Sequence, residues 1–154
     1  MKKHILFVCL ILHSARCATW ADEPSGSVAG EAARLQQAID SALPGATILC
    51  DTNKEIEVTT PLTIRKAITL QGLNARLPKK LGRTSLIVVE APGVTLAKIT
   101  LRGNYASVHQ KDRAALVRIH AGDFRVEDCT FFDSTKDGNF SISSRAAMLA
   151  SCSV

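Results

Sequence analysis

A pattern of eight residues occurs twice in this chain and constrains the fold more than any other feature. Residues 94–101 (VTLAKITL) recur as residues 124–131 (FRVEDCTF), at an offset of 30 residues. An earlier copy, LTIRKAITL, occupies residues 62–70 and has one extra residue at its centre. The apolar positions that match between the two main copies are Val94 with Phe124, Leu96 with Val126, Ile99 with Cys129, and Leu101 with Phe131. A pattern with a fixed period predicts structural units that bury their apolar sides by stacking on one another.

Each copy contains two short strands separated by a corner. Val94 and Leu96 alternate with polar residues, and after Lys98 the alternation resets, so that Ile99 and Leu101 face the same side. A third strand precedes each pair, at residues 47–50, 86–89 and 116–119. Three strands per repeat predict an all-β fold, a right-handed parallel β-helix. We expect two stacked rows of side chains: an inward row of Ile68, Ile99 and Cys129, and an outward row of Thr69, Thr100 and Thr130.

Two other fold classes fit the sequence less well. A β-sandwich favours hairpin turns such as Asn-Gly, a pair that does not occur here. An α/β fold needs helices between its strands, whereas one helical pattern occurs, at residues 31–42, with Leu35, Ala38, Ile39 and Ala42 on one face. Pro44-Gly45 ends this pattern. We therefore predict a capping helix and turn over 31–45, followed by the β-helix coils over 46–154.

The N-terminus has the pattern of a secretory signal peptide. Residues 2–4 are basic, residues 5–12 are apolar, and small and polar residues follow, ending in Thr19-Trp20-Ala21. The apolar run is shorter than the roughly 20 residues that span a bilayer, which favours a cleaved signal over an N-terminal anchor. We predict a signal peptide over 1–21, a linker over 22–30, and a secreted or periplasmic protein without stable membrane insertion.

Loss of this signal changes the interpretation of the charge. The whole chain has a net charge of +5, and removal of Lys2, Lys3 and Arg16 leaves +2. A nucleic-acid partner is therefore not indicated. The basic cluster of Lys79, Lys80 and Arg83 is interpreted as a solvated loop.

Three cysteines follow the predicted signal: Cys50, Cys129 and Cys152. Their number and spacing indicate neither a disulfide framework nor a zinc site. Cys50 and Cys129 border apolar runs and are predicted to lie in the core. One disulfide among the three stays open, because an exported protein meets an oxidising environment.

Two segments resemble a known group of proteins. LQQAIDSALPGATILC (35–50) and PLTIRKAITLQG (61–72) resemble the N-terminal part of pectin-lyase-like β-helix proteins. ALVRIHAGDFRVEDCTFFDS (115–134) resembles the chondroitinase B and alginate lyase family. The resemblance covers about residues 31–135. It implies an exported protein that acts on acidic polysaccharide. The cofactor stays open, with Ca²⁺ as a candidate in the full-length family.

The resemblance implies a lyase that cleaves acidic polysaccharide by β-elimination. About three coils are expected, and the strand at 146–149 has no closing segment after it. We therefore expect an N-terminal fragment, inactive by itself, or an oligomer whose subunits cover each other's open coil ends. The alternatives are a non-catalytic carbohydrate-binding or surface β-helix protein, and a β-helix glycoside hydrolase.

No residue is assigned a catalytic, cofactor-binding or metal-binding role from the sequence. Glu90 and His120 lie one repeat apart and are interpreted as a surface contact. Asp133 and Asp137 could flank a glycosidic bond, but their spacing does not require it. His109 and His120 have no nucleophile motif beside them. The ionisable residues near the third coil are Asp123, Arg125, Glu127, Asp128, Asp133, Lys136 and Asp137.

Overall fold

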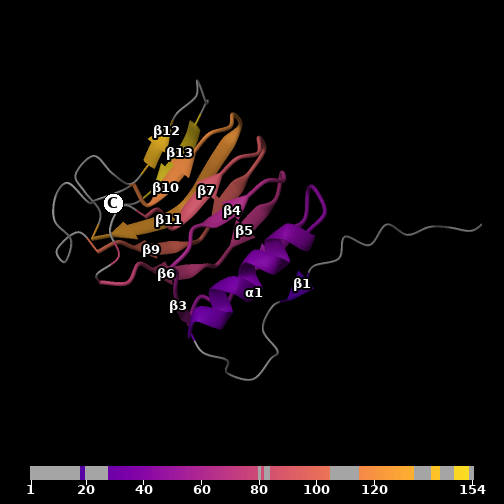
Figure 1. The fold of residues 1–154 in the computed structure, drawn as a ribbon. Helices are drawn as coiled ribbons and strands as arrows, with labels where there is room; N and C mark the ends of the chain where they lie inside the picture. The colour runs from indigo at the N-terminus through magenta and orange to yellow at the C-terminus, as the bar shows by residue number, and fades with distance from the viewer. Residues whose placement is uncertain are drawn as a thin grey trace, which may run out of the picture.

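The computed structural model describes residues 18–19, 28–79, 81, 84–104, 115–133, 140–142 and 148–152. This part of the chain is mostly β, with parallel strands in two sheets and one helix (Figure 1). Within it, no helix is both long and apolar enough to cross a membrane.

The strands form three parallel ladders, which we call A, B and C. Ladder A contains β1 (Ala18–Thr19), β2 (Thr47–Leu49), β5 (Thr69–Gln71), β8 (Thr95–Ala97), the first part of β11 (Phe124–Phe132) and β13 (Met148–Cys152). Ladder B contains β3 (Glu55–Glu57), β6 (Asn74–Arg76), β9 (Thr100–Arg102) and the second part of β11. Ladder C contains β4 (Leu62–Ile64), β7 (Ile87–Val89), β10 (Val117–Ile119) and β12 (Phe140–Ile142).

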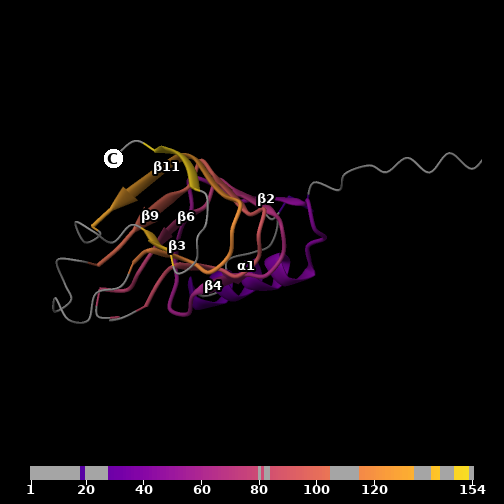
Figure 2. The same ribbon diagram turned by 90° about the horizontal axis from the view of Figure 1, so that it is seen from above.

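The chain visits the three ladders in a fixed order. From β2 to β10 successive strands enter ladders A, B and C in turn, and β11 then runs from ladder A into ladder B. Strands of one ladder therefore come from separate parts of the sequence, as the side-by-side arrows show (Figures 1 and 2). This arrangement is compatible with the predicted parallel β-helix.

Inward side chains of successive strands stack in rows and form one core. Ladder A contributes Ile48, Leu70, Leu96 and Val126, and ladder B contributes Ile56, Ala75, Leu101 and Phe131, all of them buried. Ladder C adds Leu62, Ile87 and Val117. Cys129 is buried in this core, as predicted, and Cys50, a free thiol, packs at its margin. The side chain of Cys152 lies outside the described residues.

The corner between ladders A and B explains why the sequence alternation resets. Gly72, Lys98 and Asp128 occupy equivalent positions there, with φ angles of 77°, 51° and 52°. A left-handed residue turns the chain, so that apolar residues on both sides of it point inward. Lys98 and Asp128 confirm the corner that the repeat predicted.

The repeat of 30 residues is confirmed, but the alignment of the earlier copy was wrong. Leu96 faces Val126 and Thr100 faces Thr130, as expected. The partner of Thr100 in the preceding turn is Asn74, whereas Thr69 pairs with Thr95. The inward row at this corner is accordingly Leu73, Ile99 and Cys129, and Ile68 belongs to the row of Val94 and Phe124.

The alignment failed because two corners were confused. The segment Arg65-Lys66-Ala67 joins ladder C to ladder A, while Ala97-Lys98 joins ladder A to ladder B. Both corners interrupt a period-two pattern, so alternation alone does not distinguish them. For the same reason residues 47–50, predicted as the third strand, instead form the ladder A strand β2.

Helix α1 (Val28–Ser41) lies across β3 and β4 (Figure 1). Leu35 and Ile39 are buried in the common core, which agrees with the predicted capping helix. The helix begins at Val28, so residues 28–30 were wrongly placed in the linker. The carboxylate of Glu31 sits in a helix already formed and pairs with Lys54 at 2.6 Å.

Candidate functional site

The outer face of ladder B has charged and aromatic side chains in register. Ile56, Ala75, Leu101 and Phe131 point inward, so the residues that flank them point outward. Glu57, Arg76, Arg102 and Phe132 therefore follow one another at the ends of four adjacent strands. Adjacent strands lie about 4.8 Å apart, which places these side chains within reach of one another.

Two glutamates of β3 hold the first arginine of this column. Arg76 Nη2 lies 3.1 Å from Glu57 Oε2, and Arg76 Nε lies 3.4 Å from Glu55 Oε2. The same Glu55 lies 3.9 Å from Arg102 Nη1, at the limit of an ion pair. Arg76 is therefore closely paired, and Arg102 is paired more loosely.

The second contact of Arg102 is aromatic. Its guanidinium carbon lies 5.7 Å from the centre of the Phe132 ring, within the range of a cation–π interaction. Phe132 is 45% exposed and is one of two large hydrophobic side chains exposed in the described part of the chain. An arginine beside an exposed ring thus lies at the outer end of ladder B.

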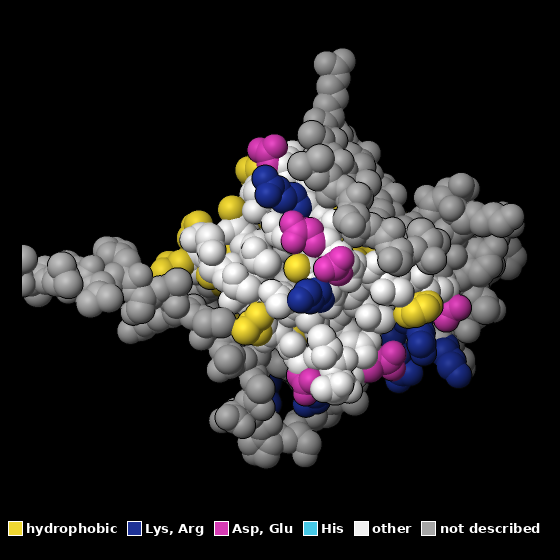
Figure 3. Space-filling view, turned by 180° about the vertical axis from the view of Figure 1, so that it is seen from behind, with side chains coloured by type: hydrophobic (Ala, Val, Ile, Leu, Met, Phe, Trp, Pro, Cys, Tyr) yellow, Lys and Arg dark blue, Asp and Glu magenta, His cyan; other side chains and the backbone are white. Residues whose placement is uncertain are grey.

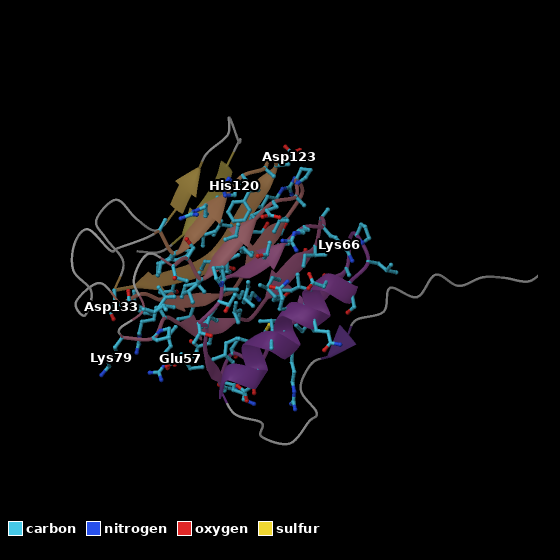
Figure 4. All side chains as sticks on the ribbon, in the orientation of Figure 1. Glu57, Lys66, Lys79, His120, Asp123 and Asp133 are labelled. Atoms are coloured by element: carbon cyan, nitrogen blue, oxygen red, sulfur yellow. The ribbon has the colours of Figure 1, made fainter. Side chains whose placement is uncertain are left out.

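A hollow of about 180 Å³ opens beside these side chains. We call it the cationic hollow, because three of its lining residues are basic and one is acidic. Its lining consists of Arg76, Leu77, Lys79, Arg102, Gly103, Asn104 and Asp133. Figure 4 shows Lys79, Glu57 and Asp133 at one end of the molecule, and Figure 3 shows basic, acidic and hydrophobic side chains gathered there.

Close backbone packing forms part of this hollow. A Cβ on Gly103 would lie 2.3 Å from the Asp133 carbonyl oxygen, so no larger residue fits at that position. Asp133 has a φ of 50°, a left-handed conformation that aspartate tolerates better than most residues. The carboxylate at the edge of the hollow is thus placed by a strained corner directly after β11.

The ionisable residues singled out in the sequence are not gathered into one site. Asp123 precedes β11 and Asp133 follows it, and the two lie at opposite ends of the molecule (Figure 4). Arg125, Glu127 and Asp128 are exposed along β11, and Lys136, Asp137 and His109 lie outside the described residues. The described part of the chain has no cluster of three or more His, Cys, Asp or Glu side chains suited to a metal.

Glu90 and His120 occupy successive positions of one column after ladder C. The carboxylate of Glu90 pairs with Arg65 Nε at 2.9 Å, one turn away in the other direction. Glu90 is thus part of an exposed ion pair, which contributes little to stability.

Sequence reasoning missed the residues that form the cationic hollow, apart from Lys79 and Asp133. Arg76 and Arg102 each end a ladder B strand and are register partners, a relation that the misaligned first copy concealed. Lys79 is exposed in its loop, as expected, but it also lines the hollow. Comparisons with family models, curated proteins and solved structures found no match to this chain.

Proposed function

We propose that this chain is an exported, right-handed parallel β-helix protein of the pectin-lyase-like kind that acts on acidic polysaccharide. The regular passage through ladders A, B and C supports the β-helix, because stacked repeats of three strands bury a continuous core. The basic and apolar pattern of residues 1–21 supports export.

The cationic hollow supports the choice of an acidic ligand. Arg102 can offer a planar pair of N–H donors to a carboxylate, and Lys79 adds a point charge at the same opening. Phe132 offers an exposed ring on which the apolar face of a sugar can rest. This combination of Arg102, Lys79 and Phe132 is the observation on which the proposal chiefly depends.

The reaction proposed at the hollow is β-elimination. Pairing with Arg102 would neutralise a uronate carboxylate and acidify the neighbouring C–H bond. Asp133 lines the same hollow and is the group placed to accept that proton, while a C4–C5 double bond forms and the C4–O bond breaks. Lys79, a cation in the same lining, is placed to give a proton to the departing glycosidic oxygen. A hydrolase would need two carboxylates flanking the bond, and one acidic residue, Asp133, lines the hollow.

Calcium, the candidate cofactor of the full-length family, does not fit the described lining. Ca²⁺ takes six to eight oxygen ligands, usually with several carboxylates among them. Asp133 is the one carboxylate among the residues that line the hollow. The proposed reaction therefore uses no step that depends on a metal.

A second function, carbohydrate binding without catalysis, is favoured by the ion pairs. Arg76 is held by Glu55 and Glu57, and Arg102 is shared between Glu55 and Phe132. Such pairing fixes the donors in a rigid binding surface, a property that serves recognition as well as reaction.

The two functions are separated by one set of measurements. The purified chain is titrated with oligogalacturonate, alginate and chondroitin sulfate, and with neutral laminarin as the control. Product is followed by the ultraviolet absorbance of the unsaturated uronate that elimination creates. Binding with product supports the lyase, and binding without product supports the second function. Equal affinity for neutral and acidic polymers, or no binding, refutes the proposal, as does an Arg102→Ala variant that binds like the wild type.

A further inference from the structure

The loop that contains Lys79 is tied to ladder B by one side chain. Lys79 lies in a turn, where the Leu81 N–H donates to the Pro78 carbonyl at 3.1 Å. The Asn104 amide nitrogen donates to the same Pro78 carbonyl at 2.8 Å and also to the Leu81 carbonyl. Asn104 therefore bridges the two ends of the turn.

Asn104 also links this turn to Arg102 of the hollow. It is two residues after Arg102, at the end of β9, and both residues line the hollow. The backbone continues the ladder here, because Leu77 N–H donates to the Arg102 carbonyl at 2.9 Å. Lys79 is exposed and has no ion-pair partner within the described residues.

We propose that Asn104 is a positioning residue that holds Lys79 over the cationic hollow, so that Lys79 and Arg102 bind the same acidic sugar unit. This inference rests on the proposed function. Both amide protons of Asn104 are used on the turn, so these donors restrict the turn and are not available to the ligand. Without Asn104, the turn keeps the one hydrogen bond between Leu81 and Pro78. The Lys79 ammonium group then samples a larger volume and is less often over the hollow.

The test is a double-mutant cycle on the affinity of the whole chain for a short oligogalacturonate. Lys79→Met is expected to weaken binding by up to about fivefold, the loss of one exposed ion pair. Asn104→Ala is expected to weaken it by a similar factor, and the double variant no more than Lys79→Met alone. The matched control is Asn74→Ala, which removes a comparable amide contact, to the Thr52 carbonyl, away from the hollow.

Salt dependence gives a second readout that a merely structural role would not change. Lys79→Met removes a charge and should flatten the dependence of affinity on salt. Asn104→Ala leaves the charge of Lys79 unaltered but should also flatten the dependence of affinity on salt. Asn74→Ala should leave that dependence as it is in the wild type. If Asn104→Ala does not fold, Asn104→Ser, which can keep one donor, replaces it.

The outcomes distinguish this inference from the proposed function. If wild-type chain binds oligogalacturonate and the two losses simply add in the double variant, the positioning role is wrong and the proposed function stands. If Asn104→Ala leaves the salt dependence unaltered, the positioning role is also wrong. If the wild-type chain binds no acidic oligosaccharide, the proposed function fails and this inference fails with it.

Discussion

Substitution of Gly72 by alanine tests the corner geometry on which the ladders depend. Gly72 has a φ of 77°, and a Cβ at this position would lie 2.8 Å from the Cys50 carbonyl oxygen. The left-handed conformation costs an L-residue about 1–2 kcal/mol. The close contact is with backbone, which cannot rotate away as a side chain can. Together these effects predict that Gly72→Ala lowers the free energy of unfolding by about 1–3 kcal/mol.

Two other corner residues separate the contributions. Gly45 has a φ of 82°, but a Cβ there would meet nothing within 4 Å. Gly45→Ala therefore has the free-energy cost of a left-handed residue but no close contact with backbone. Lys98 occupies the position equivalent to Gly72 with a φ of 51°. Lys98→Gly relieves about 1–2 kcal/mol of backbone strain but costs about 0.5–1 kcal/mol in chain entropy, so it should stabilise the fold by at most about 1.5 kcal/mol.

The assay is urea unfolding followed by circular dichroism. With a slope of about 2 kcal/mol per molar urea, Gly72→Ala should lower the midpoint by about 1 M. Gly45→Ala should lower it less, and Lys98→Gly should leave it unaltered or raise it. A midpoint for Gly72→Ala equal to that of Gly45→Ala would contradict the close approach of Gly72 to Cys50.

Three further predictions concern the core, the helix terminus and a thiol. Phe124→Ala should lower the free energy of unfolding by about 3–5 kcal/mol, because the ring is fully buried. Phe132→Ala, at an exposed ring, should have little effect on the same free energy, and urea unfolding measures both. Lys66→Met should cost about 1 kcal/mol in urea unfolding, because the ammonium donates to the Asp40 and Ala42 carbonyls at the C-terminal end of α1. Arg65→Met, which breaks an exposed ion pair, should cost less. Burial raises the pKa of the Cys50 thiol from 9.0 to about 12, so its unfolded form ionises first and stability should fall between these pH values. Cys50→Ala should remove that part of the pH dependence, measured as urea midpoints.

The candidate site was only partly predictable from the sequence. Lys79 belongs to a basic cluster that the sequence shows, and Asp133 is one of the ionisable residues near the third coil. Arg76 and Arg102 did not stand out, because each follows a short strand like any outward residue. Their importance depends on register, which places Arg76 beside Arg102 and Arg102 beside Phe132. Asn104 was equally inconspicuous, since its two acceptors lie more than twenty residues away in the chain.

The sequence by itself determined the parallel strands, the corner at Lys98 and Asp128, and the helix that packs on the first turn. These features follow from local alternation and from one helical period, which are properties of neighbouring residues. Only the tertiary structure decided which strands of the first turn pair with those of the second. A strand pattern of three residues fits any of the three ladders. Which strands pair depends on the lengths of the corners, because these lengths decide which inward side chains stack. That choice put Leu73 instead of Ile68 beside Ile99, and it formed the cationic hollow.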